Sequence, residues 1–186
     1  MKITPRLLKW GLNIYGPYLG AGVKVKFISK DWRKTRVAMK LKWYNKNIMG
    51  THFGGSLYSM VDPHLMLMLM QVLGKDYQVW DKSAEIEFIK PGRSTVYSEI
   101  EISDKDLAKI LKNTDTGEKY FHRFEVAVTD PQNDVVAKIN KVLYIKKKSA
   151  TELKNYPYER TENESDRNQQ QRQKRGIFKN YCQRHT

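Results

Sequence analysis

The residues best suited to chemistry gather in one short stretch that ends at Asp62. Glycines at positions 50, 54 and 55 lead into a strongly apolar run that contains this aspartate. Glycine lets a ligand approach the backbone closely, and the first turn of a helix offers unpaired N–H groups that can hold a developing oxyanion. The alternative is that the glycines only turn the chain tightly. Asp62 has two interpretations as well, a catalytic base or the cap of a helix that begins at Pro63.

Histidines and methionines lie close to Asp62 in the sequence. A single histidine is more often structural than catalytic, so we expect His64 to be a packing or surface residue. The methionines at 60, 66, 68 and 70 are expected in the core, with a second role as an adaptable wall of a binding site. If Asp62 is buried among them, the loss of hydration should raise its pKa and suit it to act as a base.

A buried helix is the element that must position these groups. The apolar run over about residues 54–73 has the length and composition of a helix buried on most sides. Pro63 predicts a kink or a local break beside Asp62. A shorter amphipathic helix is predicted over residues 4–14, ended by Gly16-Pro17, and we expect it to pack on the sheet rather than touch a membrane.

Alternating apolar and polar residues predict strands on both sides of the buried helix. The predicted strands cover residues 23–27, 37–43, 84–88 and 96–102 and a final hairpin of 121–129 and 135–145, with a short helix near 104–111. One buried helix without strand–helix alternation predicts an α+β domain in which an antiparallel sheet covers that helix. We expect this domain over residues 1–147 and a polar, basic extension over residues 148–186.

The composition limits the class of protein. The 186 residues, 40% of them hydrophobic, fit one globular domain without a membrane span or a signal peptide. The net charge of +14 indicates either attraction to nucleic acid, anionic membrane or a phosphorylated cofactor, or a basic surface that serves solubility. The single cysteine, Cys182, excludes an intramolecular disulfide and fits a reducing compartment. We therefore expect a cytoplasmic protein without a bound cofactor or metal.

The glycine-rich stretch resembles a known family by its spacing. The motif is Asn47-x-x-Gly50-x-x-Phe53-Gly54-Gly55, followed by Asp62. It is similar to hotdog thioesterases of the phenylacetate-degradation type, whose pattern is Asn-x-x-Gly-x-x-His-Gly-Gly with an acidic residue nine positions after the histidine. Ile86-x-Phe88-x-Lys90-Pro91-Gly92 resembles the strand that follows the helix in the same family. The segments Gly50-Thr-x-Phe-Gly-Gly-Ser-Leu-Tyr58 and Trp80-Asp81-Lys82 resemble a branch of uncharacterised hotdog proteins thought to be tetrameric acyl-CoA thioesterases.

The resemblance implies a fold, a reaction and an assembly. The fold would be a hotdog, a curved antiparallel sheet wrapped around one long central helix, over roughly residues 5–147. Asp62 would be the catalytic carboxylate, either a base on water or a nucleophile, and Gly55 the backbone donor to the thioester carbonyl. Asn47 would orient the nucleophilic side. Family sites usually lie at a dimer interface, so a homodimer or a homotetramer is expected, with an acyl-CoA as substrate.

The remaining expected substrate contacts lie around the motif and on the strand that follows the helix. They are Gly54, Phe53, His52, Tyr58, Met66, Lys82 and Arg93. Lys82 and Arg93 could meet coenzyme phosphates, or be ordinary solvated residues. Phe53 stands where the family has histidine, and His52 is displaced by one position. This departure leaves a non-catalytic acyl-CoA binder as the alternative to an enzyme, and the charge leaves a polyanion or membrane-surface module as a third hypothesis.

Overall fold

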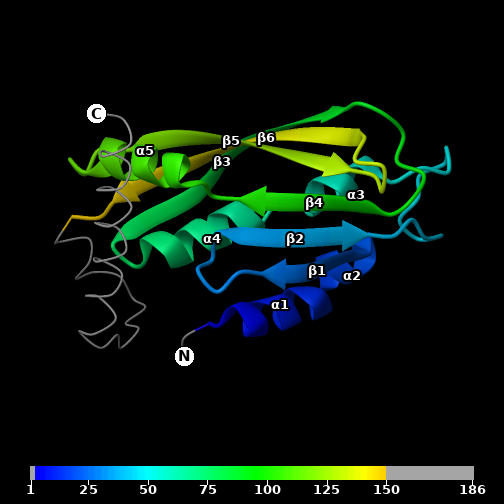
Figure 1. Cartoon of the computed structure of the whole chain (residues 1–186), viewed down its shortest axis with the longest axis horizontal. Helices are drawn as coiled ribbons and strands as arrows, with labels where there is room; N and C mark the ends of the chain where they lie inside the picture. The colour runs from blue at the N-terminus through cyan, green and yellow to red at the C-terminus, as the bar shows by residue number, and fades with distance from the viewer. Residues whose placement is uncertain (1–2, 150–186) are drawn as a thin grey trace.

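Six antiparallel strands form one sheet in the part of the chain that this computed structural model describes, residues 3–149 (Figure 1). The strands are β1 Val23–Ile28, β2 Lys34–Met39, β3 Tyr77–Phe88, β4 Val96–Glu101, β5 Tyr120–Thr129 and β6 Val135–Lys147. Their order in the sheet is β1-β2-β4-β5-β6-β3, so β1 and β3 are its two edges. The predicted hairpin is β5–β6. The predicted extension over 148–186 lies almost wholly outside the described residues.

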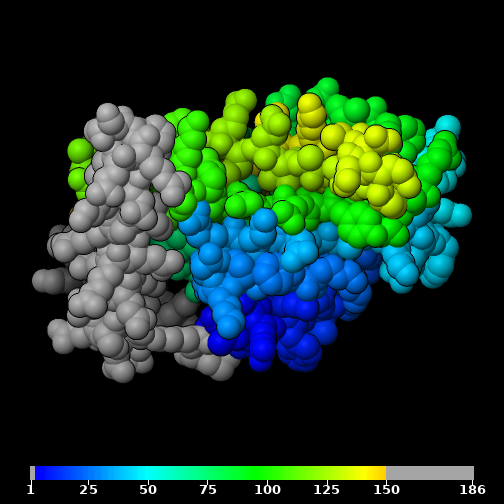
Figure 2. Space-filling model, viewed as in Figure 1, coloured from blue at the N-terminus to red at the C-terminus, as the bar shows by residue number. Residues whose placement is uncertain are grey.

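Five helices accompany the sheet over the same residues. They are α1 Pro5–Ile14, α2 Gly16–Ala21, α3 Gly54–Ser59, α4 His64–Leu73 and α5 Asp104–Thr114. Figure 1 shows α3 and α4 behind the sheet and α1 alongside β1. In the space-filling view of Figure 2, strand atoms form the near face and hide most of α4. The described part of the chain is therefore a sheet that covers a central helical segment, as the sequence predicts.

The central helix is broken where the sequence predicts it. Helix α3 ends at Ser59 and α4 begins at His64, with a tight turn between them in which Tyr58 O accepts from the N–H groups of Val61 and Asp62. Pro63 has no N–H to continue the helical ladder. The capping interpretation of Asp62 is wrong, because Pro63 occupies the N-cap of α4 and no side chain caps that helix.

Helix α4 supplies the centre of the hydrophobic core. Its inward residues, at most 1% exposed, are Leu65, Met68, Leu69 and Leu73. Burying one such side chain contributes roughly 1.5–3 kcal/mol relative to leaving it in water. The helix packs against β3, while α5 packs on β5 and β6. Much of the position of Asp62 is therefore set by the packing of α4, which begins two residues later.

Strand β2 is shorter at its end than predicted. It stops at Met39, and Trp43, expected on the inner face of the strand, is 82% exposed. The cause is Asn45, which is buried and folds the chain back on itself. Its Oδ1 accepts from Lys42 N, and its Nδ2 donates to Lys40 O and to Ala21 O. The alternation of apolar and polar residues over 37–43 therefore extends beyond Met39, where the strand ends.

Strand β3 is longer than predicted because it contains a bulge. Asp81 pairs with Leu143 and Ser83 pairs with Val142, so Lys82 is an extra residue in β3. Before the bulge the odd-numbered residues of β3 lie on the same face of the sheet as Lys141, and after it the even-numbered residues do, as the pairing of Ala84 with Lys141 shows. A sequence pattern with a strict period of two cannot follow a strand through this change of phase.

Most of β3 after Val79 is exposed to solvent in the single chain. Trp80 and Phe88 are 54% and 58% exposed, and the residues from Trp80 to Glu85 are all exposed. One edge of this twelve-residue strand has no neighbouring strand among the described residues. A long edge strand with exposed aromatic side chains is suited to pairing with another chain.

Candidate active site

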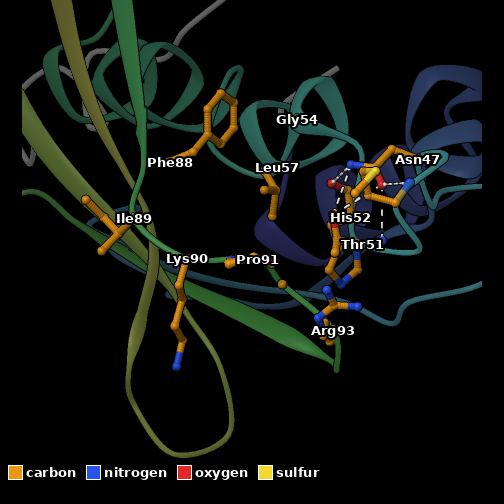
Figure 3. A pocket seen from close by; sticks show the side chains of 12 residues that line it. Asn47, Thr51, His52, Gly54, Leu57, Phe88, Ile89, Lys90, Pro91 and Arg93 are labelled. Carbon is orange, nitrogen blue, oxygen red and sulfur yellow. Dashed lines mark hydrogen bonds between the residues drawn. The ribbon is translucent and has the colours of Figure 1, made fainter.

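A pocket of about 460 Å³ lies at the start of α3 (Figure 3). Its lining is Asn47, Met49, Thr51, His52, Gly54, Leu57, Phe88, Ile89, Lys90, Pro91, Gly92 and Arg93. These residues come from the loop before α3, from α3 itself, from the end of β3 and from the segment that follows it. The volume is in the range of pockets that bind small molecules. Four of the predicted site residues, at positions 47, 52, 54 and 93, are therefore brought together here.

The side chain of Asn47 holds the loop that forms one wall of the pocket. Its Oδ1 accepts from the N–H groups of Met49 and Thr51, and its Nδ2 donates to Thr51 Oγ1 at 2.9 Å. Gly50 completes the turn at φ 73°, a left-handed conformation that favours glycine. Asn47 thus acts on the backbone of its own loop, and this geometry favours a structural role.

His52 is buried in the pocket wall. Its backbone N–H donates to Gly92 O, and its Nε2 lies 2.8 Å from Ser94 O, which can only accept. Nε2 therefore carries the proton, and buried Nδ1 has no hydrogen-bond partner within residues 3–149. Burial lowers the pKa of His52, against a smaller opposite effect of the bond to Ser94. The histidine is neutral at physiological pH and ties two segments together.

Phe53, at the position of the family's histidine, lies against Gly55. A Cβ added to Gly55 would come 2.6 Å from Phe53 Cε1, so the ring occupies the space beside that glycine. On the other side, a Cβ on Gly54 would meet Phe88 Cζ at 2.8 Å. Both rings are more than half exposed. Exposed aromatic rings thus flank the two glycines that start α3.

Three basic side chains near the pocket, those of Arg93, Lys90 and Lys82, have different surroundings. Arg93 lines the pocket and has no ion-pair partner among the residues that the structure describes. Lys90 points away from the other labelled residues in Figure 3, and its Nζ lies 2.7 Å from both Asp130 and Asp134. Lys82 is exposed at the bulge of β3 and is absent from the pocket lining. Arg93 is therefore the cation placed to meet a ligand.

Asp62 lies past the other end of α3, in a second cluster. Its Oδ1 accepts from the hydroxyl of Tyr58 at 2.6 Å and from Nζ of Lys141 at 2.8 Å. Lys141 Nζ also donates to the Asp62 backbone carbonyl and lies over the Tyr58 ring, 5.6 Å from its centroid. Oδ2 has no hydrogen-bond partner among residues 3–149, and the side chain is 46% exposed. One carboxylate oxygen is therefore fixed and the other is open.

The expected rise in the pKa of Asp62 is wrong. Burial by itself does raise this pKa, but the hydrogen bonds from Lys141 and Tyr58 and the charge of Lys141 outweigh it, so the pKa lies below its ordinary value. Burial and the bond to Asp62 raise the pKa of Tyr58, which stays protonated and donates. Asp62 is thus ionised at neutral pH.

Lys141 and Asp81 also belong to this cluster, and neither is among the site residues that the sequence predicts. Lys141 is fully buried on β6, and its Nζ lies 3.2 Å from Asp81 Oδ1. A signal for Lys141 exists in the sequence, because it stands in the inward phase of its strand between Ile139 and Leu143, both fully buried. A lysine whose side chain points to the buried face of a strand requires anions close to its ammonium group.

The remaining predicted residues near Asp62 are packed. His64 is buried, its Nε2 lies 2.8 Å from the hydroxyl of Tyr18, and burial followed by the charge of Lys141 lowers its pKa to about 3. It is a neutral packing residue, as expected. Met66 is half-buried on α4 and packs against the core. Among these, Tyr58 alone touches the catalytic candidate.

The pocket and Asp62 are separated within one chain. Asp62 is not among the residues that line the pocket, and the six residues of α3 lie between the glycine-rich loop and the turn that carries Asp62. A helix rises 1.5 Å per residue, so α3 spans roughly 9 Å. A single chain therefore presents the two parts of the predicted site at opposite ends of one short helix.

A third polar cluster contains the residue types of a hydrolytic triad without its order. Asp106 lies between the other two members, accepting from Ser103 Oγ and lying 3.1 Å from His122 Nε2. Nucleophilic catalysis requires the histidine beside the serine. The serine instead caps α5, whose capping box it forms with Asp106. This cluster is structural.

The family model for a domain of unknown function (DUF4442) matches residues 4–145, more than half of the sequence. The chain belongs to this family. No match was found among curated proteins. No helix within residues 3–149 has both the length and the apolarity needed to cross a membrane. Membership in DUF4442 therefore agrees with the uncharacterised branch that the motifs resemble, and by itself it assigns no activity.

Solved structures similar to this DUF4442 chain share its fold at low sequence identity. A Pseudomonas aeruginosa protein of unknown function, described as a probable thioesterase, is 15% identical, with a TM-score of 0.68 over 80% of this chain and 99% of that one. A Haemophilus influenzae thioesterase is 12% identical, with a TM-score of 0.57 over 79% and 93%. A mutant of the phenylacetic acid degradation protein PaaI from Thermus thermophilus is 16% identical, with a TM-score of 0.50 over 70% and 98%. The predicted hotdog fold is confirmed.

Proposed function

We propose that this DUF4442 protein hydrolyses an acyl thioester, with coenzyme A as the carrier, in the cytoplasm. The observation that carries the proposal is Asp62, a carboxylate fixed through Oδ1 and open at Oδ2. It stands nine positions after Phe53, at the place of the acidic residue in the phenylacetate-type motif. The similarity to structures called thioesterases supports the proposal at the level of fold.

The chemistry follows from the open oxygen. Asp62 Oδ2 accepts a proton from water as the water oxygen attacks the thioester carbonyl carbon, and the carbonyl oxygen becomes an oxyanion. Collapse of this intermediate breaks the C–S bond, releases the thiolate, which takes up a proton, and leaves the carboxylic acid. Direct attack by Oδ2, followed by hydrolysis of the resulting anhydride, gives the same products. In the proposal, the backbone N–H of Gly55 donates to the oxyanion.

A second copy of the chain is part of the proposal. The separation of the pocket from Asp62 in one chain and the uncovered edge of β3 both support a site between two chains. In such an assembly, a dimer or a dimer of dimers, Asp62 faces groups from the other chain. The apolar side chains of Leu57, Phe88 and Ile89 suit an acyl or pantetheine segment in the pocket, with Arg93 near the phosphates.

The test is an assay of the purified full chain with acyl-CoA substrates of increasing chain length, following release of the free thiol. We expect turnover by the wild type and a loss of roughly 10²–10⁴-fold in kcat/KM for Asp62→Asn, since a positioned base contributes about this much. Asp115→Asn is the matched control, because Asp115 is an exposed carboxylate that also pairs with a lysine, Lys147. Equal turnover by wild type and Asp62→Asn contradicts the proposed mechanism.

A non-catalytic acyl-CoA binder is the second candidate, and Phe53 favours it. Its ring lies against Gly55, the residue that would donate to the oxyanion, where the family pattern has a histidine. Isothermal titration with an acyl-CoA separates the two functions: binding without thiol release identifies a binder. Phe53→His should then leave binding in place, and a gain of turnover in that variant would show what the substitution removed.

A further inference from the structure

Lys141 is a buried cation in an otherwise apolar layer. It lies on the core face of β6, opposite Ala84 of β3 and Phe124 of β5, and its side chain is 1% exposed. Placing an ammonium group there is costly unless oxygen atoms replace its hydration. Lys141 Nζ contacts the Asp62 carbonyl, Asp62 Oδ1 at 2.8 Å and Asp81 Oδ1 at 3.2 Å. Two carboxylates therefore share one buried lysine.

The two carboxylates reach Lys141 from elements far apart in the sequence. Asp62 comes from the turn between α3 and α4, and Asp81 from the edge strand β3, directly before its bulge at Lys82. Asp81 pairs with Leu143, which puts its side chain on the same face of the sheet as Lys141. The bulge lets β3 keep this inward carboxylate and still present Ala84 opposite Lys141. Bulges commonly re-aim side chains next to functional sites.

We propose that Lys141 is the positioning residue for Asp62, and that Asp81 moderates it by competing for the same ammonium group. This inference rests on the proposed thioester hydrolysis. Lys141 holds Oδ1 of Asp62, so that Oδ2 faces outward in a fixed direction. Asp81 takes part of the positive charge, so that Asp62 keeps more of its basicity than it would in an exclusive pair with Lys141. Neither residue needs to touch substrate.

The charges around Asp62 agree with this division of roles. From α3, Tyr58 donates to Oδ1, and from α4, His64 faces it as a neutral ring bonded to Tyr18 of α2. From the sheet, Lys141 and Asp81 are the charged neighbours. The pKa of Asp62 lies below its ordinary value, whereas burial, aided by the charge of Asp62, raises the pKa of Asp81 against the opposing effect of Lys141. The shared lysine thus leaves two carboxylates with opposite shifts.

Two substitutions should move the pH dependence of hydrolysis in opposite directions. In Lys141→Met, Asp62 loses its cation while burial remains, so its pKa rises and the acid limb of the kcat/KM profile moves to higher pH, by about 1 unit or more. In Asp81→Asn, Lys141 acts on Asp62 alone, so that pKa falls and the acid limb moves to lower pH, by roughly half a unit. Lys141→Arg keeps the charge and should restore most of the wild-type profile. A residue that only supports the fold would not produce opposite shifts.

The experiment measures pH–rate profiles of the four proteins together with carboxyl ¹³C NMR titrations of Asp62. Lys138→Met is the matched control, an exposed lysine on the same strand, and should leave the profile unchanged. Unfolding transitions of all variants establish that they are folded. Unmoved acid limbs in Lys141→Met and Asp81→Asn, in folded and active proteins, overturn the inference and leave the proposed function standing. A wild type that hydrolyses no acyl-CoA overturns both, and the NMR titrations then show whether the electrostatic coupling exists without catalysis.

Discussion

At the start of α3 the loop that forms one wall of the pocket is held by neutral groups that are neighbours in sequence, whereas the cluster past the end of α3 is built from charges contributed by three separate elements. Asn47 folds the loop at the first end with hydrogen bonds that stay within residues 47–52. At the second end, Lys141 is 79 residues away from Asp62 along the chain. A local motif therefore specifies the loop at one wall of the pocket, while the ionisation of a carboxylate depends on partners that no local motif contains.

The largest loss of folding stability is expected when Lys141, in the cluster past the end of α3, loses both of its anionic partners. Asp62→Asn together with Asp81→Asn leaves Lys141 buried without an anion, and we expect the free energy of unfolding to fall by ~3–5 kcal/mol. Adding Lys141→Met should recover most of this loss, because an apolar side chain of similar length suits the surrounding core. Urea unfolding of the double and triple variants measures both values. A triple variant no more stable than the double one would show that the charges are not what destabilises it.

At the start of α3, folding stability should instead be lost when a side chain is too large for the space available. A Cβ on Gly92 would lie 3.0 Å from His52 Cδ2 and 3.2 Å from Val136 Cγ1, and both neighbours are almost fully buried. Gly92→Ala should therefore lower the free energy of unfolding by ~1–3 kcal/mol, the usual cost of overpacking. Gly54→Ala is the control: its Cβ would meet the exposed Phe88 ring, which can swing aside. Thermal unfolding that ranks Gly54→Ala as the more damaging change would reverse this assignment.

The smallest expected effect concerns ligand binding rather than folding stability, and it compares the pocket with the bulge of β3. Arg93 lines the pocket and Lys82 lies on the β3 bulge, so Arg93→Ala should raise the KM for acyl-CoA more than Lys82→Ala does. An exposed charge contact of about 0.5–1 kcal/mol corresponds to roughly a 2–5-fold change in KM. The Arg93 effect should shrink with added salt. If Lys82→Ala has the larger effect, the phosphates lie over β3 and not at the pocket.

The sequence predicts most of the fold because its signals are periodic and local. The break at Pro63, the hairpin of β5 and β6, and the helix over α5 are all found where the pattern puts them. The errors have local physical causes: Asn45 ends β2 early, and the bulge at Lys82 hides the first half of β3 from a period of two.

Only part of the candidate site could be predicted from the sequence. The glycine-rich loop and Asp62 could be named from spacing, but the direction of the pKa shift of Asp62 could not, since it depends on Lys141 arriving from β6. The phase of Lys141 between Ile139 and Leu143 was a usable signal, because an inward-facing lysine must have an anion to meet. The sequence does not say which anion that is, and only the register of β3 and β6 brings Asp81 to it.

The bulge in β3 also affects which other chains can pair with this edge of the sheet and so cause aggregation. Aggregation between sheet edges needs a long, flat row of unpaired N–H and C=O groups, and a bulge interrupts that row. A foreign extended segment laid along β3 would fall out of register at Lys82, unless it carried a matching irregularity. This edge strand of twelve residues is thereby a poor template for unrelated extended segments, while an identical strand, which carries the same irregularity, can still be accommodated.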